Sequence, residues 1–357
     1  MKILVTGNMG YVGPLVLHRL RESHPRATLI GYDAGYFAHC LTGASRLPET
    51  RVDVQYFGDI RQVSENVLEG VDSVVHLCAI SNDPMGAAFE EVTLDINYRA
   101  SVALAQKAKN RGVKRFVFAS SCSVYGCAEG GPRREEDSLN PLTAYAKSKI
   151  NTERDLTSLA SETFTTTCLR FATACGMSDR LRLDLVLNDF VAGSLASKQI
   201  KILSDGSPWR PLIHVKDMAR AIDWAVQRDY RDGGVALTIN VGSEGWNYQV
   251  KDLAAAVAKV IPDVEVLINK DAQPDKRSYR VNFDKFTKLA QGFLPAVDLQ
   301  EAVTDLRDGL SKMRFQDADF RTGEFMRLVT LKRLREQGQL NDNLEWKNRT
   351  ASFMKSD

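Results

Sequence analysis

The sequence of 357 residues predicts an α/β protein built on a doubly wound parallel sheet, with a smaller C-terminal lobe. Short runs rich in β-branched and apolar residues alternate with longer segments of helical periodicity through the first half of the chain. These short runs are continuously apolar, which is the pattern of strands that are buried on both faces of a parallel sheet.

Strands and helices alternate in a fixed order in this prediction. The expected strands of the first half lie at 2–7, 27–33, 52–57, 73–79, 114–121 and 165–171. The expected helices between them lie near 11–24, 90–112 and 143–161. After residue 176 the pattern is less regular, with helices near 184–198, 215–229 and 249–261 and strands at 200–204 and 237–242.

Composition restricts the class of partner. The 47 Lys and Arg nearly balance the 45 Asp and Glu, so no charge excess favours nucleic acid. No apolar run approaches the length of a membrane span, and the apolar N-terminus is too short for a signal peptide. The six cysteines and five histidines lack the spacing of a metal site. We expect a cytoplasmic protein with reduced cysteines, no metal and a small-molecule substrate.

A glycine-rich turn joins the first strand to the first helix. Gly7, Gly10 and Gly13 in TGNMGYVG are spaced so that the backbone turns tightly and approaches a diphosphate at a helix N-terminus. Asp33 ends the next strand, 20 residues after Gly13, where a carboxylate binds ribose hydroxyls and repels a 2′-phosphate. A simple glycine turn and a capping Asp33 are the alternatives. Together the two features predict a Rossmann-type site that prefers NAD to NADP.

Three polar residues form a candidate catalytic group. Tyr145 and Lys149 are four apart on a predicted helix and therefore share one face, although this spacing also occurs on solvent-exposed helices. Ser121 lies in the stretch SSCSVYG, which follows a buried strand at the edge where α/β sheets bind ligands. A catalytic tyrosine has to lose its proton well below its ordinary pKa of about 10. The Lys149 ammonium and an oxidised nicotinamide both favour the phenolate.

These motifs together resemble the extended short-chain dehydrogenase/reductases that act on nucleotide sugars, the NAD-dependent epimerase/dehydratase group. The resemblance runs from about residue 2 to 310. It rests on several motifs in the family's order: TGNMGYVG, Asp33, FGDI, HLCA with Asn97 downstream, SSCSVYG, YAKSK, LRFATACG and GSPWRPLIHVKDMARA.

The resemblance implies a role for individual residues. Ser121, Tyr145 and Lys149 correspond to the catalytic triad. The implied NAD-binding residues, besides Tyr145, Lys149 and those named above, are Met9, Tyr11, Val12, Asp59, Ile60, Leu77, Ala79, Ser120 and Thr173. The implied substrate-binding residues, besides Ser121, are Ser81, Asn82, Asp83, Cys122, Ser123, Asn188, Arg210, Arg277 and Arg280. A turn at 81–86 and a basic turn around Arg277 are alternative interpretations of the last groups.

The residues after Ser121 bear on the reaction. Dehydratases of the family carry an acidic residue one or two places after the catalytic hydroxyl, whereas this chain has Cys122 and Ser123. The stretch is similar to that of the 4-epimerases, in which a 4-ketosugar turns over and NAD is regenerated. A nucleotide-sugar dehydrogenase or ketoreductase is the alternative. A 4,6-dehydratase or an inactive NAD-binding protein is less favoured, and RLRLDLVLNDF resembles members that handle modified sugars.

The resemblance also predicts the domain organisation. We assign 1–176 to the NAD-binding domain, with segments near 214–244 returning to it, and 177–213 and 245–310 to a substrate-binding lobe. Residues 311–357 form a charged, helical extension, which we expect on the surface or at a subunit contact. The aromatic segment 35–44 either packs over adenine or covers the sheet. The helices near 90–112 and 143–161 resemble those of the family's dimer interface, so we expect a homodimer.

Overall fold

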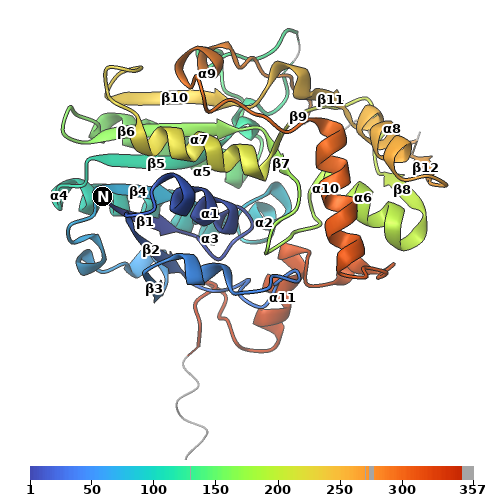
Figure 1. Ribbon diagram of the computed structural model, residues 1–357, viewed down its shortest axis with the longest axis horizontal. Helices are drawn as coiled ribbons and strands as arrows, with labels where there is room; N and C mark the ends of the chain where they lie inside the picture. Colours follow the sequence, from blue (N-terminus) through green and yellow to red (C-terminus); the bar gives the residue numbers. More distant parts are fainter. Residues whose placement is uncertain (129, 270, 273–276, 348–357) are drawn as a thin grey trace, which may run out of the picture.

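The structure is a computed structural model that describes residues 1–128, 130–269, 271–272 and 277–347. Residues 348–357 of the predicted extension lie outside the described residues. Figure 1 shows a parallel sheet at the centre, a smaller lobe beside the carboxyl ends of its strands, and a C-terminal segment that returns to the sheet. The α/β class predicted from the sequence is confirmed.

Seven parallel strands form the main sheet, in the order β10-β6-β5-β4-β1-β2-β3. They are β1 Lys2–Thr6, β2 Thr28–Asp33, β3 Val54–Phe57, β4 Ser73–His76, β5 Arg115–Ser121, β6 Thr165–Phe171 and β10 Ala236–Val241. The strand order reverses between β1 and β4, and a crevice at such a switch point is where open α/β sheets bind ligands. β3 is an exposed edge strand and not a buried one, because no further strand covers it in the described structure.

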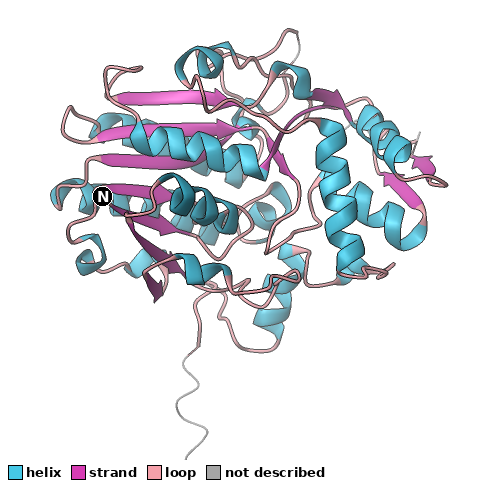
Figure 2. Cartoon of the chain, in the orientation of Figure 1, coloured by secondary structure: helices cyan, strands magenta, loops and turns pink. Residues whose placement is uncertain are grey.

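Helices cover both faces of this sheet (Figure 2). On one face α1 (Gly13–Ser23) packs against α7 (Val215–Gln227). On the other face α4 (Ala100–Asn110) packs against α5 (Ala144–Leu159). Each face has its own cluster of buried apolar side chains. The continuous apolar strands are thus buried from both sides, as their sequence pattern requires.

The single helix predicted near 90–112 is wrong in detail. The structure has α3 (Glu90–Leu94), a π-helical turn η4 (Asp95–Arg99) and then α4. The wide turn leaves the Asn97 carbonyl to accept hydrogen bonds from the hydroxyls of Ser101, at 2.8 Å, and Thr152, at 3.0 Å. Side-chain donors therefore satisfy a carbonyl in the interrupted helix, an arrangement that apolar periodicity does not reveal.

The sequence analysis found one strand of the smaller lobe, expected at 200–204, and missed the others. β7 (Thr173–Cys175), β9 (Trp209–His214) and β11 (Asn247–Gln249) form one short sheet, and β8 (Gln199–Ile202) pairs with β12 (Glu265–Ile268). The helices of this part are α6 Val186–Ser197, α8 Val250–Val260 and α10 Leu299–Lys312, whereas α9 (Asp284–Leu289) packs against β10 of the main sheet. The predicted boundary between 310 and 311 falls inside α10, so the lobe continues into the segment that we had assigned to the extension.

The C-terminal segment packs against its own chain, contrary to the surface or subunit contact that we expected. It includes η7 (Phe320–Thr322) and α11 (Arg327–Glu336). Its buried apolar side chains are Phe320, Leu331, Leu334, Leu340 and Leu344. The apolar residues are sparse among charges, so only the folded chain shows that they face one common surface. No helix that the structure describes is both long and apolar enough to span a bilayer.

A buried ion pair links β5, β6 and α5. Arg170 Nη2 lies 2.8 Å from Glu153 Oε2, and both side chains are 6% exposed. The Ser120 hydroxyl donates to the same carboxylate. Removing one member of such a pair leaves an uncompensated buried charge.

Replacing Glu153 by Gln is expected to lower the free energy of unfolding by about 3 kcal/mol, because Arg170 then keeps its charge without a counter-ion. Urea denaturation of the two proteins measures the difference. Glu91→Gln is the matched control, since Glu91 pairs with Arg99 at 2.7 Å on the surface and its loss should leave stability unchanged. Equal effects of the two substitutions would contradict the importance of the buried pair.

Candidate active site

A cavity of about 1050 Å³ lies at the carboxyl ends of the sheet strands, between the sheet and the smaller lobe. Its volume is at the upper end of ligand pockets, which suits two ligands side by side. Most of the residues predicted from the sequence line it: Gly7, Gly10, Tyr11, Val12, Asp33, Leu77, Ala79, Ser81, Asn82, Asp83, Ser120, Ser121, Ser123, Tyr145, Lys149, Thr173, Arg210 and Arg277. The predicted residues outside the lining are Met9, Gly13, Asp59, Ile60, Asn97, Cys122, Asn188 and Arg280.

The glycine turn leaves no room for larger residues, because a Cβ there would collide with neighbouring backbone atoms. A Cβ at Gly7, whose φ is +74°, would lie 2.6 Å from the backbone nitrogen of Cys78. A Cβ at Gly13 would lie 2.1 Å from the carbonyl oxygen of Asn8. Gly7 therefore allows β1 to approach β4, and Gly13 allows α1 to begin directly at the turn. The first N–H groups of α1 remain to bind an anion at this end of the cavity.

Asp33 closes the adenosine end of the predicted coenzyme site. Its carboxylate accepts hydrogen bonds from the backbone nitrogens of Met9, at 2.9 Å, and Gly35, at 2.8 Å. Burial raises the pKa of Asp33, and these two hydrogen bonds oppose the rise. A carboxylate accepts about four hydrogen bonds, so two acceptor positions remain for ribose hydroxyls. Met9 thus acts through its backbone, by orienting Asp33.

Asp59, Ile60 and Asn97, which were also predicted to bind the coenzyme, lie outside the cavity lining and make contacts within the protein. Asp59 forms an ion pair with Arg61, at 2.5 Å, and Ile60 is buried in the core. Asn97 accepts from the backbone nitrogen of Ile80 at 2.8 Å and donates to its carbonyl at 2.9 Å. The Asn97 side chain therefore holds the loop after β4 in place, and it does not itself reach the cavity.

The candidate catalytic residues meet at one wall of the cavity. Ser121 and Tyr145 both line the cavity, and the Ser121 hydroxyl lowers the pKa of Tyr145. Lys149 Nζ donates to the carbonyl of Ala119 at 2.7 Å and lies 5.5 Å from the centre of the Tyr145 ring. The hydroxyl of Thr143 caps α5 by accepting from Ala146 N at 3.1 Å, so the helix begins just before Tyr145.

Burial opposes ionisation at both of these groups. It raises the pKa of Tyr145 to about 12, an effect opposed by the Ser121 hydrogen bond and the Arg182 guanidinium and increased by Asp83. It lowers the pKa of Lys149 to about 8. From the sequence we expected Lys149 to be the protein cation that favours phenolate. The structure adds Arg182, which lies in the segment RLRLDLVLNDF but which we had not singled out.

Side chains of the stretch SSCSVYG alternate between the core and the cavity. Ser120 donates to Glu153, and the Cys122 thiol donates to the Arg170 carbonyl at 3.1 Å. Burial raises the pKa of the Cys122 thiol well above its ordinary value. Ser121 and Ser123 line the cavity, and Ser123 Oγ is buried without a hydrogen-bond partner in the part of the chain that the structure describes. Cys122 is therefore a packing residue and not a substrate ligand.

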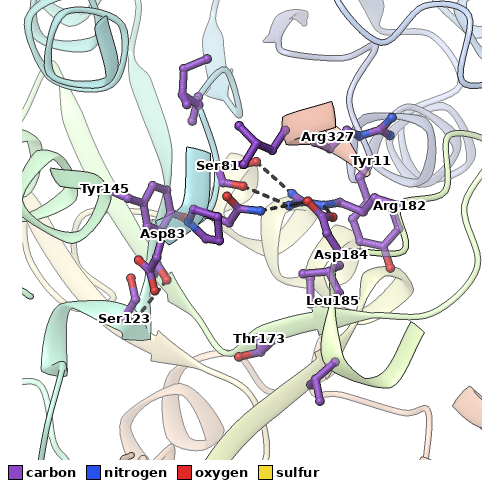
Figure 3. Close-up of a pocket in the computed structure, with 18 of the residues that line it drawn as sticks. Tyr11, Ser81, Asp83, Ser123, Tyr145, Thr173, Arg182, Asp184, Leu185 and Arg327 are labelled. Carbon is purple, nitrogen blue, oxygen red and sulfur yellow. Dashed lines mark hydrogen bonds and ion pairs between the residues drawn. The ribbon is translucent and has the colours of Figure 1, made fainter. Parts of the chain in front are cut away.

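The loop after β4 forms a polar cluster with the smaller lobe (Figure 3). Arg182 donates to the Ser81 hydroxyl at 2.9 Å and pairs with Asp184 at 2.7 Å. Asn82 donates to Asp184, also at 2.9 Å. The backbone of Asn82 has a φ of 149°, which is strained for a residue with a side chain, and its Oδ1 accepts from Met85 N. The predicted turn at 81–86 is thus the start of α2 (Asp83–Ala88).

The arginines predicted at the substrate end have different positions. Arg210 and Arg277 line the cavity, and Arg277 Nη1 lies 2.9 Å from Asp83 Oδ2. Arg280 instead places its guanidinium 5.2 Å from the centre of the Trp209 ring. These contacts leave Arg210 and Arg277 as candidates for an anionic substrate group, and they give Arg280 a packing role.

Asn188, predicted to contact the substrate, is fully buried in α6. Its Oδ1 accepts from Gly176 N at 3.0 Å, and its Nδ2 donates to Tyr11 Oη at 3.1 Å and Arg182 O at 2.9 Å. The side-chain amide is therefore satisfied within the protein. It positions Tyr11 and Arg182, which themselves line the cavity.

Residues 3–242 match the family model described as the NAD dependent epimerase/dehydratase family. The chain belongs to this family. Its members are NAD-dependent enzymes, and the glycine cradle, Asp33 and the Tyr145–Lys149 wall fit that coenzyme. Among the described residues no three His, Cys, Asp or Glu side chains gather as a metal site would require.

Relatives in the family have more than one named activity. The chain is 30% identical over 291 residues to a UDP-glucose 4-epimerase of Neisseria gonorrhoeae, covering 72% of this chain and 81% of the relative. It is 28% identical to a dTDP-glucose 4,6-dehydratase of Streptomyces griseus, covering 84% and 91%. The solved UDP-glucose 4-epimerase of Thermotoga maritima superposes with a TM-score of 0.74 at 23% identity, covering 88% of this chain and all of that one. This last likeness establishes the fold.

Replacing Asp33 by Asn is expected to increase the ratio of NADP to NAD affinity about tenfold or more, because the negative charge that repels a 2′-phosphate is removed. Dissociation constants for both coenzymes, measured by calorimetry, give this ratio. Asp53→Asn removes a similar charge at the opposite end of β2, where Asp53 pairs with Arg21, and should leave the ratio unchanged. An unchanged ratio in Asp33→Asn would contradict the assigned role.

Proposed function

We propose that the protein is a nucleotide-sugar 4-epimerase that uses Tyr145 as its acid/base. The observation that carries the proposal is the meeting of Ser121, Tyr145 and Lys149 in one cavity, where the positions after Ser121 hold no carboxylate. The relatives named as 4-epimerases support the choice of carbon C4.

Each residue at this wall has a separate task. Tyr145, as phenolate, removes the proton from the C4 hydroxyl of the sugar and returns it later. The Ser121 hydroxyl donates to the oxygen that becomes a carbonyl, and Arg182 favours the phenolate from the other side. Lys149, held by the Ala119 carbonyl, adds a donor for the coenzyme ribose. NAD, when bound, supplies a reversible hydride acceptor at this carbon.

Inversion at C4 requires the ketosugar to present its second face to the same acceptor. The cavity is large enough for this rotation, and the nucleotide end has to remain anchored while it occurs. We assign the anchor to Arg210 and Arg277, because guanidinium groups bind phosphate through paired hydrogen bonds. The neutral Ser123 hydroxyl, unpaired in the described structure, is a candidate donor to a sugar hydroxyl as it turns.

The charge pattern of the cavity favours epimerisation over dehydration. Described carboxylates in the lining are Asp33, Asp83, Asp184 and Asp189. Asp83 pairs with Arg277, Asp184 with Arg182 and Asp189 with Arg321, while Asp33 accepts from the backbone. A paired carboxylate is a weak proton shuttle because its partner stabilises the charged form. C5 proton transfer, which dehydration needs, therefore has no obvious base here.

The homodimer expected from the family resemblance remains a prediction. The helical face that would form it includes the surface of α5, where the hydroxyl of Tyr98 donates to Asp155 at 2.7 Å. Such a contact would be polar, since Arg154 also lies on this face.

Turnover of a panel of nucleotide sugars in heavy water tests the reaction. We expect a stereoisomer without solvent deuterium and without net NADH. Deuterium at C5 or C6 would establish dehydration or C5 chemistry, and stoichiometric NADH would establish a dehydrogenase; either result would overturn the proposal. Tyr145→Phe should lower kcat at least a hundredfold, roughly the contribution of general acid/base catalysis. Tyr230→Phe, which removes a hydroxyl from an exposed tyrosine, is the matched control.

Arg182 is expected to influence the pH profile of kcat. Its positive charge lowers the pKa of Tyr145, so Arg182→Gln raises that pKa and leaves less phenolate at a given pH. The acidic limb of the kcat profile should therefore move to higher pH, by about one unit. Arg321→Gln, which also removes a cavity-lining arginine paired with an aspartate, should leave the limb in place. An unmoved limb in Arg182→Gln would show that Arg182 serves only to hold the loop.

A further inference from the structure

The C-terminal segment forms part of the cavity wall, although the family model ends at residue 242. Its lining residues are Arg321, Met326, Arg327, Leu328 and Val329. Figure 1 shows this segment returning beneath the edge of the sheet that contains β2 and β3. The coenzyme end of the cavity is therefore bounded by residues from both ends of the chain.

Arg327, the first residue of α11, is a buried cation at this wall. Its side chain is 2% exposed, its Nη2 donates to the Arg180 carbonyl at 2.8 Å, and its guanidinium carbon lies 4.4 Å from the centre of the Phe37 ring. Its Nη1 is buried and has no hydrogen-bond partner among the residues that the structure describes. Burial lowers the pKa of Arg327 to about 10, so it is still a cation at neutral pH.

Other arginines of the wall differ from Arg327 in having a close carboxylate. Arg182 lies 2.7 Å from Asp184, and Arg321 lies 2.8 Å from Asp189. No ion pair joins Arg327 to a carboxylate within the described part of the chain; besides burial, the groups that influence its pKa are Cys40, Arg182 and Asp184. A buried cation without a counter-ion is destabilising, and a bound anion would remove that penalty. Arg327 can therefore donate hydrogen bonds to an anionic group at this wall.

The position of Arg327 identifies the anion. Figure 3 places Arg327 and Tyr11 on the same side of the cavity as Arg182. Tyr11 belongs to the turn between β1 and α1, where the glycine cradle and the helix N-terminus form the expected binding site for a diphosphate. Phe37, against which Arg327 stacks, follows Asp33 at the adenosine end. Arg327 therefore lies between the adenosine end and the catalytic wall.

We propose that Arg327 binds the diphosphate of the coenzyme, so that the C-terminal segment supplies an anion ligand from outside the nucleotide-binding domain. A diphosphate bound there would meet both the N-terminus of α1 and the Arg327 guanidinium, each of which favours an anion.

The same segment is tied to the loop after Asp33. The Tyr36 hydroxyl donates to the Leu344 carbonyl, and Trp346 Nε1 donates to the Ala34 carbonyl at 2.6 Å. The Tyr36 and Trp346 rings lie 5.8 Å apart. These contacts hold the segment that contains Arg327 against the loop that follows Asp33.

Binding to the coenzyme-free protein tests the proposal without any turnover. The variants are Arg327→Met and Arg327→Lys, both of which lose the donation to Arg180, whereas only the second keeps the charge. We expect Arg327→Met to weaken NAD and ADP-ribose about 10- to 100-fold, the range for a lost charged hydrogen bond, with Arg327→Lys in between. Lys332→Met removes an exposed charge from the same helix and should bind like the parent.

Thermal melting separates ligand binding from a purely structural role. Without ligand, Arg327→Met should melt at or above the parent temperature, because a buried unpaired charge is removed, yet NAD should stabilise it less than the parent. Equal loss of affinity in the Met and Lys variants, together with a lower melting temperature, would make Arg327 a structural residue and overturn the proposal. Weakened UDP with unchanged ADP-ribose would assign Arg327 to the substrate diphosphate and overturn it as well. Absence of epimerase activity would leave these binding results unaffected.

Discussion

The buried ion pair between Glu153 and Arg170 orients the catalytic helix. Tyr145, Lys149 and Glu153 follow one another at intervals of four residues, so they share one face of α5. Glu153 binds Arg170 of β6 and the Ser120 hydroxyl at the end of β5, which sets the rotation of that face toward the sheet. With Glu153 held in the core, Lys149 reaches the Ala119 carbonyl and Tyr145 reaches the cavity.

Many charged groups around the cavity form ion pairs, and Tyr145 and Arg327 are two exceptions that bear on ligand binding. Most cavity carboxylates are paired with an arginine: Asp83 with Arg277, Asp184 with Arg182 and Asp189 with Arg321. Tyr145, in contrast, is raised to a pKa of about 12 by burial and needs positive charge from its surroundings before it can act. Arg327 is charged but has no paired carboxylate in the described structure, and its Nη1 has no acceptor there. In our proposal a ligand phosphate supplies both the opposite charge and the acceptor. In both cases we expect a bound ligand to supply the missing opposite charge.

Sequence patterns predicted the features that depend on local spacing. The continuous apolar strands, the glycine turn with Asp33, and the Tyr145–Lys149 interval all lie within short stretches whose geometry follows from backbone periodicity. The π-helical turn at Asn97, the start of α2 at Asp83 and all but one of the short strands of the lobe were missed. The turn at Asn97 and the lobe strands depend on hydrogen bonds to residues distant in sequence, such as Asn97 with Ile80, and apolar periodicity contains no record of such partners. The start of α2 depends on a local cap, in which Asn82 Oδ1 accepts from Met85 N.

By itself the sequence determined the fold class and located the glycine cradle and the candidate catalytic side chains, because each is encoded by neighbouring residues with a fixed backbone geometry. Tertiary structure alone decided which of the predicted residues reach the cavity. It turned Cys122 and Asn188 inward, where their polar atoms are satisfied, and brought Arg182 and Arg327 to the cavity from the lobe and the C-terminal segment. The physical reason is that burial and charge pairing are properties of the assembled chain, whose contributing segments lie far apart in sequence.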